Sequence, residues 1–124
     1  MLFRSDTTAT PLQSLVLLND PQFIEASRVL GEKLLKQFPA DEMARNREAF
    51  RSLTGRAPDK AEAKILAQLF SEQRNQFKFD VEGATKLLNT GESKWDKSLP
   101  PAEFAAMTTL VNAIMNFDEF VVER

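Results

Sequence analysis

The sequence predicts an all-α fold of about six helices packed around a central, largely apolar C-terminal helix. Apolar residues recur at the three- and four-residue spacing of helices along most of the chain, and no segment alternates convincingly with the period of two that strands show. Capping residues and prolines mark the expected helix boundaries. The last expected helix, residues 101–117, is apolar nearly all round, which is typical of a helix enclosed by others.

Length and composition limit both the fold and the chemistry. The 124 residues suffice for one domain with a single core, which we place at residues 10–121 after an extended lead-in at residues 1–9. The net charge of −2 gives no reason to expect nucleic acid as a partner. The chain has no cysteine and no histidine, which excludes disulfides and Cys/His zinc sites, and we expect no cofactor. No stretch of the sequence is apolar for long enough to span a membrane.

The N-terminal part of the chain predicts two consecutive helices with a sharp corner between them. Thr10 is the expected cap of the first helix, because a proline follows it at the first helical position. Asp20 caps the second helix in the same way, and we expect that helix to cover residues 21–38. Its expected core face is Phe23, Ala26, Leu30 and Leu34, widened by Val29 and Phe38, and its solvent face is Glu25, Arg28, Glu32 and Lys36.

The middle of the chain predicts three further helices. Asp41 caps the first of them, which ends at Gly55 in a left-handed conformation. Asp59 and Glu62 form a capping box for the next, which reaches about residue 78, and Asp80 caps a short helix that ends before residue 90. The expected inward residues are Met43, Phe50 and Leu53 in the first, and Ile65, Leu66, Leu69, Phe70 and Phe77 in the second.

A narrow polar stripe runs along the apolar C-terminal helix. Asn112 and Asn116 lie four residues apart and share one side of the helix with Thr108 or Thr109. Inside an apolar environment these side chains need hydrogen-bond partners. We therefore expect structural roles for both asparagines.

Two groups of charged residues are candidate sites, each with a structural alternative. Asp118 and Glu119 suit a hard cation or an acid/base pair, together with Asp20, or they form a solvated helix end. Arg47 and Arg51 lie four residues apart and can converge on an anion or a docking partner. The alternative is an ordinary solvated face, which the interspersed carboxylates favour. The whole basic region comprises Arg45, Arg47, Arg51, Arg56, Lys60 and Lys64.

The longest expected loop, residues 91–101, carries Glu92 and Trp95. Functional residues concentrate in such loops, so Trp95 is a candidate for anchoring a partner or stacking on a sugar, and its alternative role is a lid on the core. Ser93 in the same loop has no histidine to activate it. We therefore expect no catalytic residue in this chain.

Four blocks of the sequence resemble, in the same order, the planctomycete-type PSD domain of unknown function (domain of unknown function fifteen fifty-three). They are residues 10–23, 50–62, 91–93 and 116–120, and the first and last are the more specific. The resemblance runs from about residue 4 to residue 121 and implies the C-terminal part of a larger family domain. Such domains close large envelope proteins of Planctomycetes, Verrucomicrobia and relatives, which commonly begin with a cytochrome-c-like haem segment. A periplasmic or cell-envelope location is implied by this context.

The sequence thus favours a helical structural or interaction module. Its expected partner is the remainder of a parent protein or another protein, and an exposed apolar patch would also permit a homodimer. The alternative is a non-catalytic or accessory part of a carbohydrate-active or redox enzyme. That alternative requires a pocket that gathers Trp95, Glu92 and a carboxylate from Asp118 or Glu119.

Overall fold

The computed structural model of this protein describes residues 20–91 and 94–122, with side chains as far as residue 116. The described residues form five α-helices. No strand occurs among these residues, which confirms the all-α prediction. Thr10, its expected helix and the lead-in lie outside the described residues, so five of the six expected helices are seen. They are α1 (Pro21–Gln37), α2 (Glu42–Thr54), α3 (Lys60–Phe79), α4 (Val81–Leu88) and α5 (Pro101–Val122).

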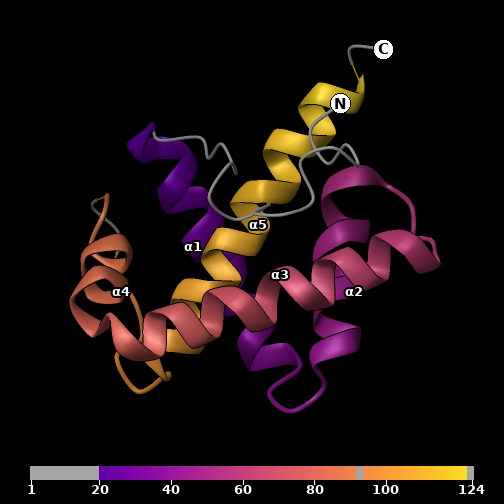
Figure 1. The fold of residues 1–124 in the computed structure, drawn as a ribbon. Coiled ribbons are helices and arrows are strands. Elements are labelled where there is room, and N and C mark those ends of the chain that lie inside the picture. The colour runs from indigo at the N-terminus through magenta and orange to yellow at the C-terminus, as the bar shows by residue number, and fades with distance from the viewer. Residues whose placement is uncertain (1–19, 92–93, 123–124) are drawn as a thin grey trace.

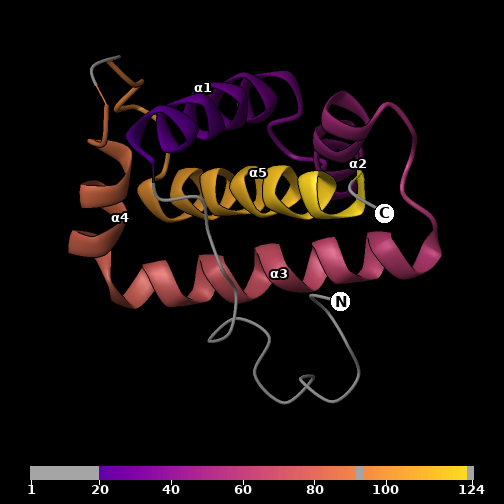
Figure 2. The same ribbon diagram turned by 90° about the horizontal axis from the view of Figure 1, so that it is seen from above.

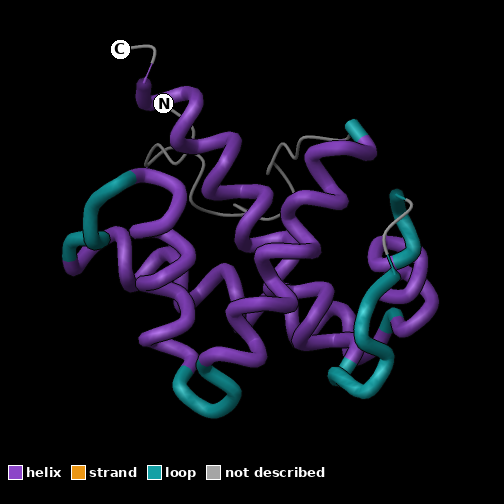
Figure 3. Tube along the Cα trace, turned by 180° about the vertical axis from the view of Figure 1, so that it is seen from behind, coloured by secondary structure: helices purple, strands orange, loops and turns teal. Residues whose placement is uncertain are grey.

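Helix α5 runs through the middle of the fold (Figure 1). Viewed from above, α1 and α3 lie along opposite sides of it, with α2 towards its C-terminal end and α4 towards its N-terminal end (Figure 2). Short connections join α1 to α2, α2 to α3 and α3 to α4, whereas a longer segment, residues 89–100, precedes α5 (Figure 3). Every residue from 104 to 114 is buried, including the Asn112 side chain. The prediction of a central, largely apolar helix is therefore confirmed.

Capping interactions fix the start of each of the first four described helices. The Asp20 carboxylate accepts the N–H of Gln22 at 2.8 Å, and Pro21 occupies the first turn of α1. The backbone N–H of Ala44 donates to Asp41, and that of Gly83 donates to Asp80. Each such bond satisfies an N–H group that has no partner within its own helix. The expected capping box at the start of α3 is present, with Asp59 and Glu62 bonded to each other's backbone N–H groups.

The buried face of α1 differs from the expected one. Phe23, Ala26 and Val29 are exposed, whereas the buried residues are Ser27, Arg28, Gly31, Leu34 and Leu35. The true face is rotated because two of its members are small and let α1 approach α5 closely. Arg28, which the sequence placed on the solvent face, is fully buried, and its Nη2 lies 3.8 Å from Oε2 of Glu25.

Two further expectations about burial need correction, and one helix is longer than expected. Met43 lies on α2 but is 71% exposed, because the buried face of that helix carries Arg45, Asn46, Ala49 and Phe50 instead. Ile65 is partly exposed at 38%, beside the fully buried Phe70 on the same helix. Helix α5 continues to Val122 rather than ending near residue 117.

Gly31 packs closely against the backbone of α5. A Cβ atom at this position would lie 3.5 Å from the Thr108 nitrogen and 3.6 Å from the Met107 carbonyl carbon, which are ordinary van der Waals distances. Alanine is a better helix former than glycine, so Gly31→Ala is expected to raise the free energy of unfolding by about 0.5–1 kcal/mol. Gly31→Leu is expected to lower it by about 1–3 kcal/mol, because the extra atoms must push α5 away.

Urea unfolding of the two Gly31 variants beside the wild type measures both effects. If the removal of glycine acted only through helix propensity, both variants would be more stable than the wild type. Changes of opposite sign in the free energy of unfolding therefore indicate that α1 packs closely on α5. A leucine variant as stable as the alanine variant would contradict the close approach of α1 and α5.

Candidate functional site

Of the sequence-predicted binding residues that the structure describes, Trp95 lies in the segment before α5, whereas Arg47 and Arg51 lie on α2. Trp95 is partly buried, and its ring meets Phe104 edge to face, with 5.5 Å between the ring centroids and an interplanar angle of 80°. The indole N–H donates to Oδ1 of Asn89 at 2.9 Å. Trp95 therefore packs on the N-terminal half of α5, while Glu92 lies outside the described residues.

The loop that carries Trp95 is tied to α1 through Asp96. The carboxylate accepts hydrogen bonds from the backbone N–H and hydroxyl of Ser98, at 2.9 and 2.6 Å, and lies 3.2 Å from the Lys36 ammonium group. Lys36 also pairs with Glu32 at 3.1 Å. The bonds from Ser98, together with Lys36, lower the pKa of Asp96 from 3.8 to about 2.

Acid titration is expected to weaken this loop through Asp96. A carboxyl group with a lowered pKa in the folded state adds stability above its unfolded pKa, and that contribution is lost as the pH falls through the folded value. The loss attributable to Asp96 therefore falls between its ordinary pKa of 3.8 and its folded pKa of about 2. Thermal melts of wild type and Asp96→Asn across this window are expected to show a weaker pH dependence in the variant. Equal slopes of melting temperature against pH in the two proteins would contradict the assignment of this loss to Asp96.

The basic region of the sequence is divided by the fold. Arg45 is buried at 1% exposure, which corrects the expectation that it belongs to a solvated face. Arg51 and Arg56 are exposed but form ion pairs with Glu48 at 2.6 Å and with Glu62 at 2.8 Å, respectively. The Arg56 guanidinium group also lowers the pKa of Glu62. These two cations are therefore paired with neighbouring carboxylates, which weakens the positive field around them.

Arg45 belongs to a buried cation–aromatic cluster between α2 and α3. Its Nη1 donates to the Phe38 carbonyl oxygen at 3.0 Å, and its guanidinium carbon lies 5.0 Å from the centroid of Phe70. Arg74 approaches the same ring at 5.3 Å and pairs with Glu42 at 2.6 Å. Burial lowers the pKa of Arg45, and the charges of Glu103 and Glu42 act in the opposite direction. The cluster ties the end of α1, α2 and α3 together.

The remaining predicted site residues are structural or lie beyond the described side chains. Asp20 serves as the N-cap of α1. Asn112 is buried at 3% exposure in α5, and Asn116 lies one turn further along at intermediate exposure; both make interactions within the chain. Asp118 belongs to the last turns of α5, and its side chain is outside the described part. Among the described residues, no group of three acidic side chains is placed to hold a metal ion.

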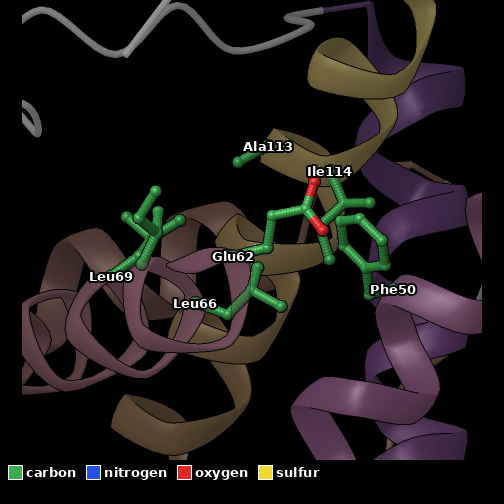
Figure 4. A pocket seen from close by; sticks show the side chains of 7 residues that line it. Phe50, Glu62, Leu66, Leu69, Ala113 and Ile114 are labelled. Atoms are coloured by element: carbon green, nitrogen blue, oxygen red, sulfur yellow. The ribbon is translucent and has the colours of Figure 1, made fainter. Parts of the chain in front are cut away.

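An apolar depression lies where α2, α3 and α5 meet, and we name it the α5 groove. Phe50 from α2 and Leu66 and Leu69 from α3 face Ala113 and Ile114 of α5 across it (Figure 4). Ile65 and Glu62 complete the lining. The space that it encloses is only about 30 Å³, far below that of a small-molecule pocket. The α5 groove therefore suits contact with a surface rather than enclosure of a ligand.

A second hollow, the α2–α3 pocket, lies between the first halves of these two helices. It has a volume of about 420 Å³, within the range of ligand-binding clefts. Leu66 lines both hollows. The other residues that line the pocket are Asp41, Met43, Asn46, Arg47, Pro58, Asp59, Lys60 and Ala63.

Sequence reasoning missed both hollows, although it picked out Arg47 for another reason. The α5 groove combines residues from three segments that are far apart in the chain, so no local pattern signals it. One feature of the sequence could have indicated the α2–α3 pocket. Arg45 and Asn46 share the helical face of Ala49 and Phe50. Polar residues on an apolar face are candidates for buried polar interactions.

The described helices define an all-α module whose surface includes the apolar α5 groove and the α2–α3 pocket of mixed character. The sequence profile of the PSD1 family, described as a protein of unknown function (DUF1553), matches residues 2–70. This match covers more than half of the 124 residues, and the chain belongs to that family. No curated protein and no solved structure shows a significant match.

The region that matches the family profile is shorter than the region over which the four sequence blocks resemble the family. It includes residues 10–23 and 50–62 but ends at residue 70, before residues 91–93 and 116–120. The matched region takes in α1, α2 and the first half of α3. The helices described in the structure include none with the length and apolar character needed to cross a membrane.

Proposed function

We propose that this chain is a helical protein-interaction module that docks another polypeptide on the α5 groove. The observation that carries this proposal is the lining of the groove, where side chains from three helices form an almost wholly apolar depression with the exposed Ile65 at its edge. Its one carboxylate, Glu62, is already neutralised by Arg56 at 2.8 Å. A partner therefore has to offer apolar side chains, and an amphipathic helix is the element that best supplies them to a groove between helices.

The partner that we propose is a polypeptide segment outside residues 1–124. The resemblance to the end of large envelope proteins supports the remainder of a parent protein as that segment. Membership of the PSD1 family is compatible with this context and does not require it. The position of Trp95 favours an interaction module over an accessory part of a carbohydrate-active or redox enzyme, because its ring packs against Phe104 and its N–H group donates to Asn89.

Site-specific photocrosslinking tests the proposed function. A photoreactive amino acid at Ile65, which is partly exposed in the α5 groove, should form crosslinks to whatever covers the groove in the cell. Mass spectrometry of the crosslinked peptide then identifies the occupant. A matched control places the same amino acid at Phe79, which is 92% exposed on the same helix but away from the groove.

The identity of the crosslinked peptide decides the proposal. Crosslinks from position 65 to a polypeptide outside residues 1–124, without the same product from position 79, are the expected result. The proposal is overturned if position 65 reacts only with residues of its own chain, only with a second copy, or with nothing. Sequencing the complete gene independently shows whether a parent reading frame extends upstream.

A further inference from the structure

One apolar face of α1 is left open by the residues that the structure describes. Phe23 and Val29 keep 46% and 50% of their surface exposed, and Ala26 between them is exposed as well. Because these three residues are spaced by three, they lie along one side of the helix, and we name them the α1 outer face. Single exposed apolar residues need no explanation, whereas a contiguous group indicates a surface that another element contacts.

The small size of the α1 outer face argues against a separate molecule as its occupant. A stable complex buries about 800 Å² on each partner, contributed by about 20–30 residues. Three side chains, of which Phe23 and Val29 are about half exposed, offer only a small part of that area. A segment already joined to α1 needs much less contact area, because a short tether gives it an effective concentration in the millimolar range.

The chain supplies such a segment directly before α1. Residues 10–19 carry no charge and contain five aliphatic side chains, at positions 12 and 15–18. The sequence predicts a helix here that ends at Asn19, and the bond from the Gln22 N–H to Asp20 fixes the start of α1. Asn19 and Asp20 then join the two helices, and a connection of two residues suits an antiparallel helix pair.

From these observations we propose that residues 10–19 form a helix that folds back along α1 and covers the α1 outer face. Antiparallel pairing places three leucines opposite the three residues of this face: Leu18 with Phe23, Leu15 with Ala26, and Leu12 with Val29. Each step of three residues advances both helices by about 4.5 Å, so the three contacts stay in register. Gln13 and Leu17 fall on the opposite side of the proposed helix.

This contact is separate from the function proposed for the α5 groove. Helices α1 and α3 lie on opposite sides of α5 (Figure 2), and the groove is lined from α2, α3 and α5. Either proposal can therefore fail without the other. The match to the PSD1 family runs from residue 2 through α1, so the segment and the helix that it covers belong to one matched region.

Disulfide trapping tests the proposal, because the chain has no cysteine of its own. The variant Leu15→Cys/Ala26→Cys should form an internal disulfide under mild oxidation, since facing positions of packed helices bring the two Cα atoms within about 7 Å. The matched control is Leu17→Cys/Ala26→Cys, which changes the same residue types but places one thiol on the opposite side. We expect it to close at least about tenfold more slowly. Non-reducing electrophoresis separates internal disulfides from linked dimers.

Hydrogen exchange measures the same contact without any cysteine. The amides of residues 14–18 should exchange at least about tenfold more slowly in the full chain than in a free peptide of residues 10–19. Ala26→Asp should remove this protection, because it places a charge in the apolar contact. Gln37→Asp, at an exposed position at the far end of α1, should leave the protection unchanged.

The proposal is overturned if the Leu15→Cys/Ala26→Cys variant stays reduced, or if its control closes equally fast. Disulfide-linked dimers in place of the internal bond would assign the α1 outer face to a second copy. Exchange of residues 14–18 at the rate of the free peptide would show that the segment is not docked, and this result serves even if the cysteine variants do not fold. Equal loss of protection in Ala26→Asp and Gln37→Asp would contradict the location of the contact.

Discussion

Phe104→Ala is expected to lower the free energy of unfolding by about 3–5 kcal/mol, the usual cost of removing a buried aromatic ring. Phe104 has no exposed surface and lies in the first buried turn of α5. Its ring also supports Trp95, whose edge-to-face contact would be lost. The variant leaves a cavity in the part of the core that α5 shares with α4 and the preceding loop. Urea unfolding followed by circular dichroism measures the loss.

Phe79→Ala is the matched control for this prediction. It removes the same side chain from a helix end where the ring is 92% exposed, so we expect a change within about 0.5 kcal/mol. A cost below about 1 kcal/mol for Phe104→Ala would mean that α5 is not the centre of the core. Fluorescence of Trp95, the only tryptophan, should change in Phe104→Ala and not in Phe79→Ala.

Arg45→Ala is expected to lower the free energy of unfolding by about 2–4 kcal/mol, through the cavity and the lost hydrogen bond. The substitution leaves the Phe38 carbonyl oxygen without its donor at 3.0 Å and removes the cation from the face of Phe70. Arg45→Met keeps most of the buried volume and removes a charge whose burial is itself unfavourable. We expect the methionine variant to lie within about 1 kcal/mol of the wild type.

Arg47→Ala provides the control, because Arg47 lies on the same helix and is exposed. Its expected effect on stability is within about 0.5 kcal/mol. Equal losses in the alanine and methionine variants of Arg45 would contradict the assignment of its role mainly to packing. They would assign the stabilisation to the hydrogen bond with Phe38 and to the charge over Phe70.

Helix boundaries could be predicted from the sequence because their signals are local. Asp20, Asp41, Asp59 and Asp80 each precede the helix that they cap, and the capping bond forms within two or three residues. Gly55 adopts a φ angle of 83°, as a residue that ends a helix in the left-handed region does. Such interactions depend on the chain next to them and hardly on the fold.

The buried faces were harder to predict because they depend on the neighbouring helix. On α1, Ser27 and Gly31 are buried because small residues permit close contact with α5, whereas hydropathy alone favours Phe23 and Val29. Arg28 was assigned to water because of its charge, whereas its whole side chain, guanidinium group included, is buried beside Glu25. The partner helix lies more than sixty residues further along the chain, so the local pattern carries no information about it.

The candidate sites could not be predicted for a related reason. The lining of the α5 groove comes from α2, α3 and α5, and its depth depends on how these helices cross. The α2–α3 pocket likewise forms only once both of its helices are placed. The sequence did exclude cysteine and histidine chemistry, since that conclusion needs no coordinates.

The order of the described helices along the chain has a consequence for synthesis on the ribosome. Proteins emerge from their N-terminus, so α1 to α4 leave the tunnel before the helix on which they all pack. Until residues 101–122 follow, the apolar faces that pack on α5 lack their main partner and are open to chaperones or to self-association. A stalled nascent chain that lacks these residues should therefore be cut readily by protease, and completing it should confer resistance in a single late step.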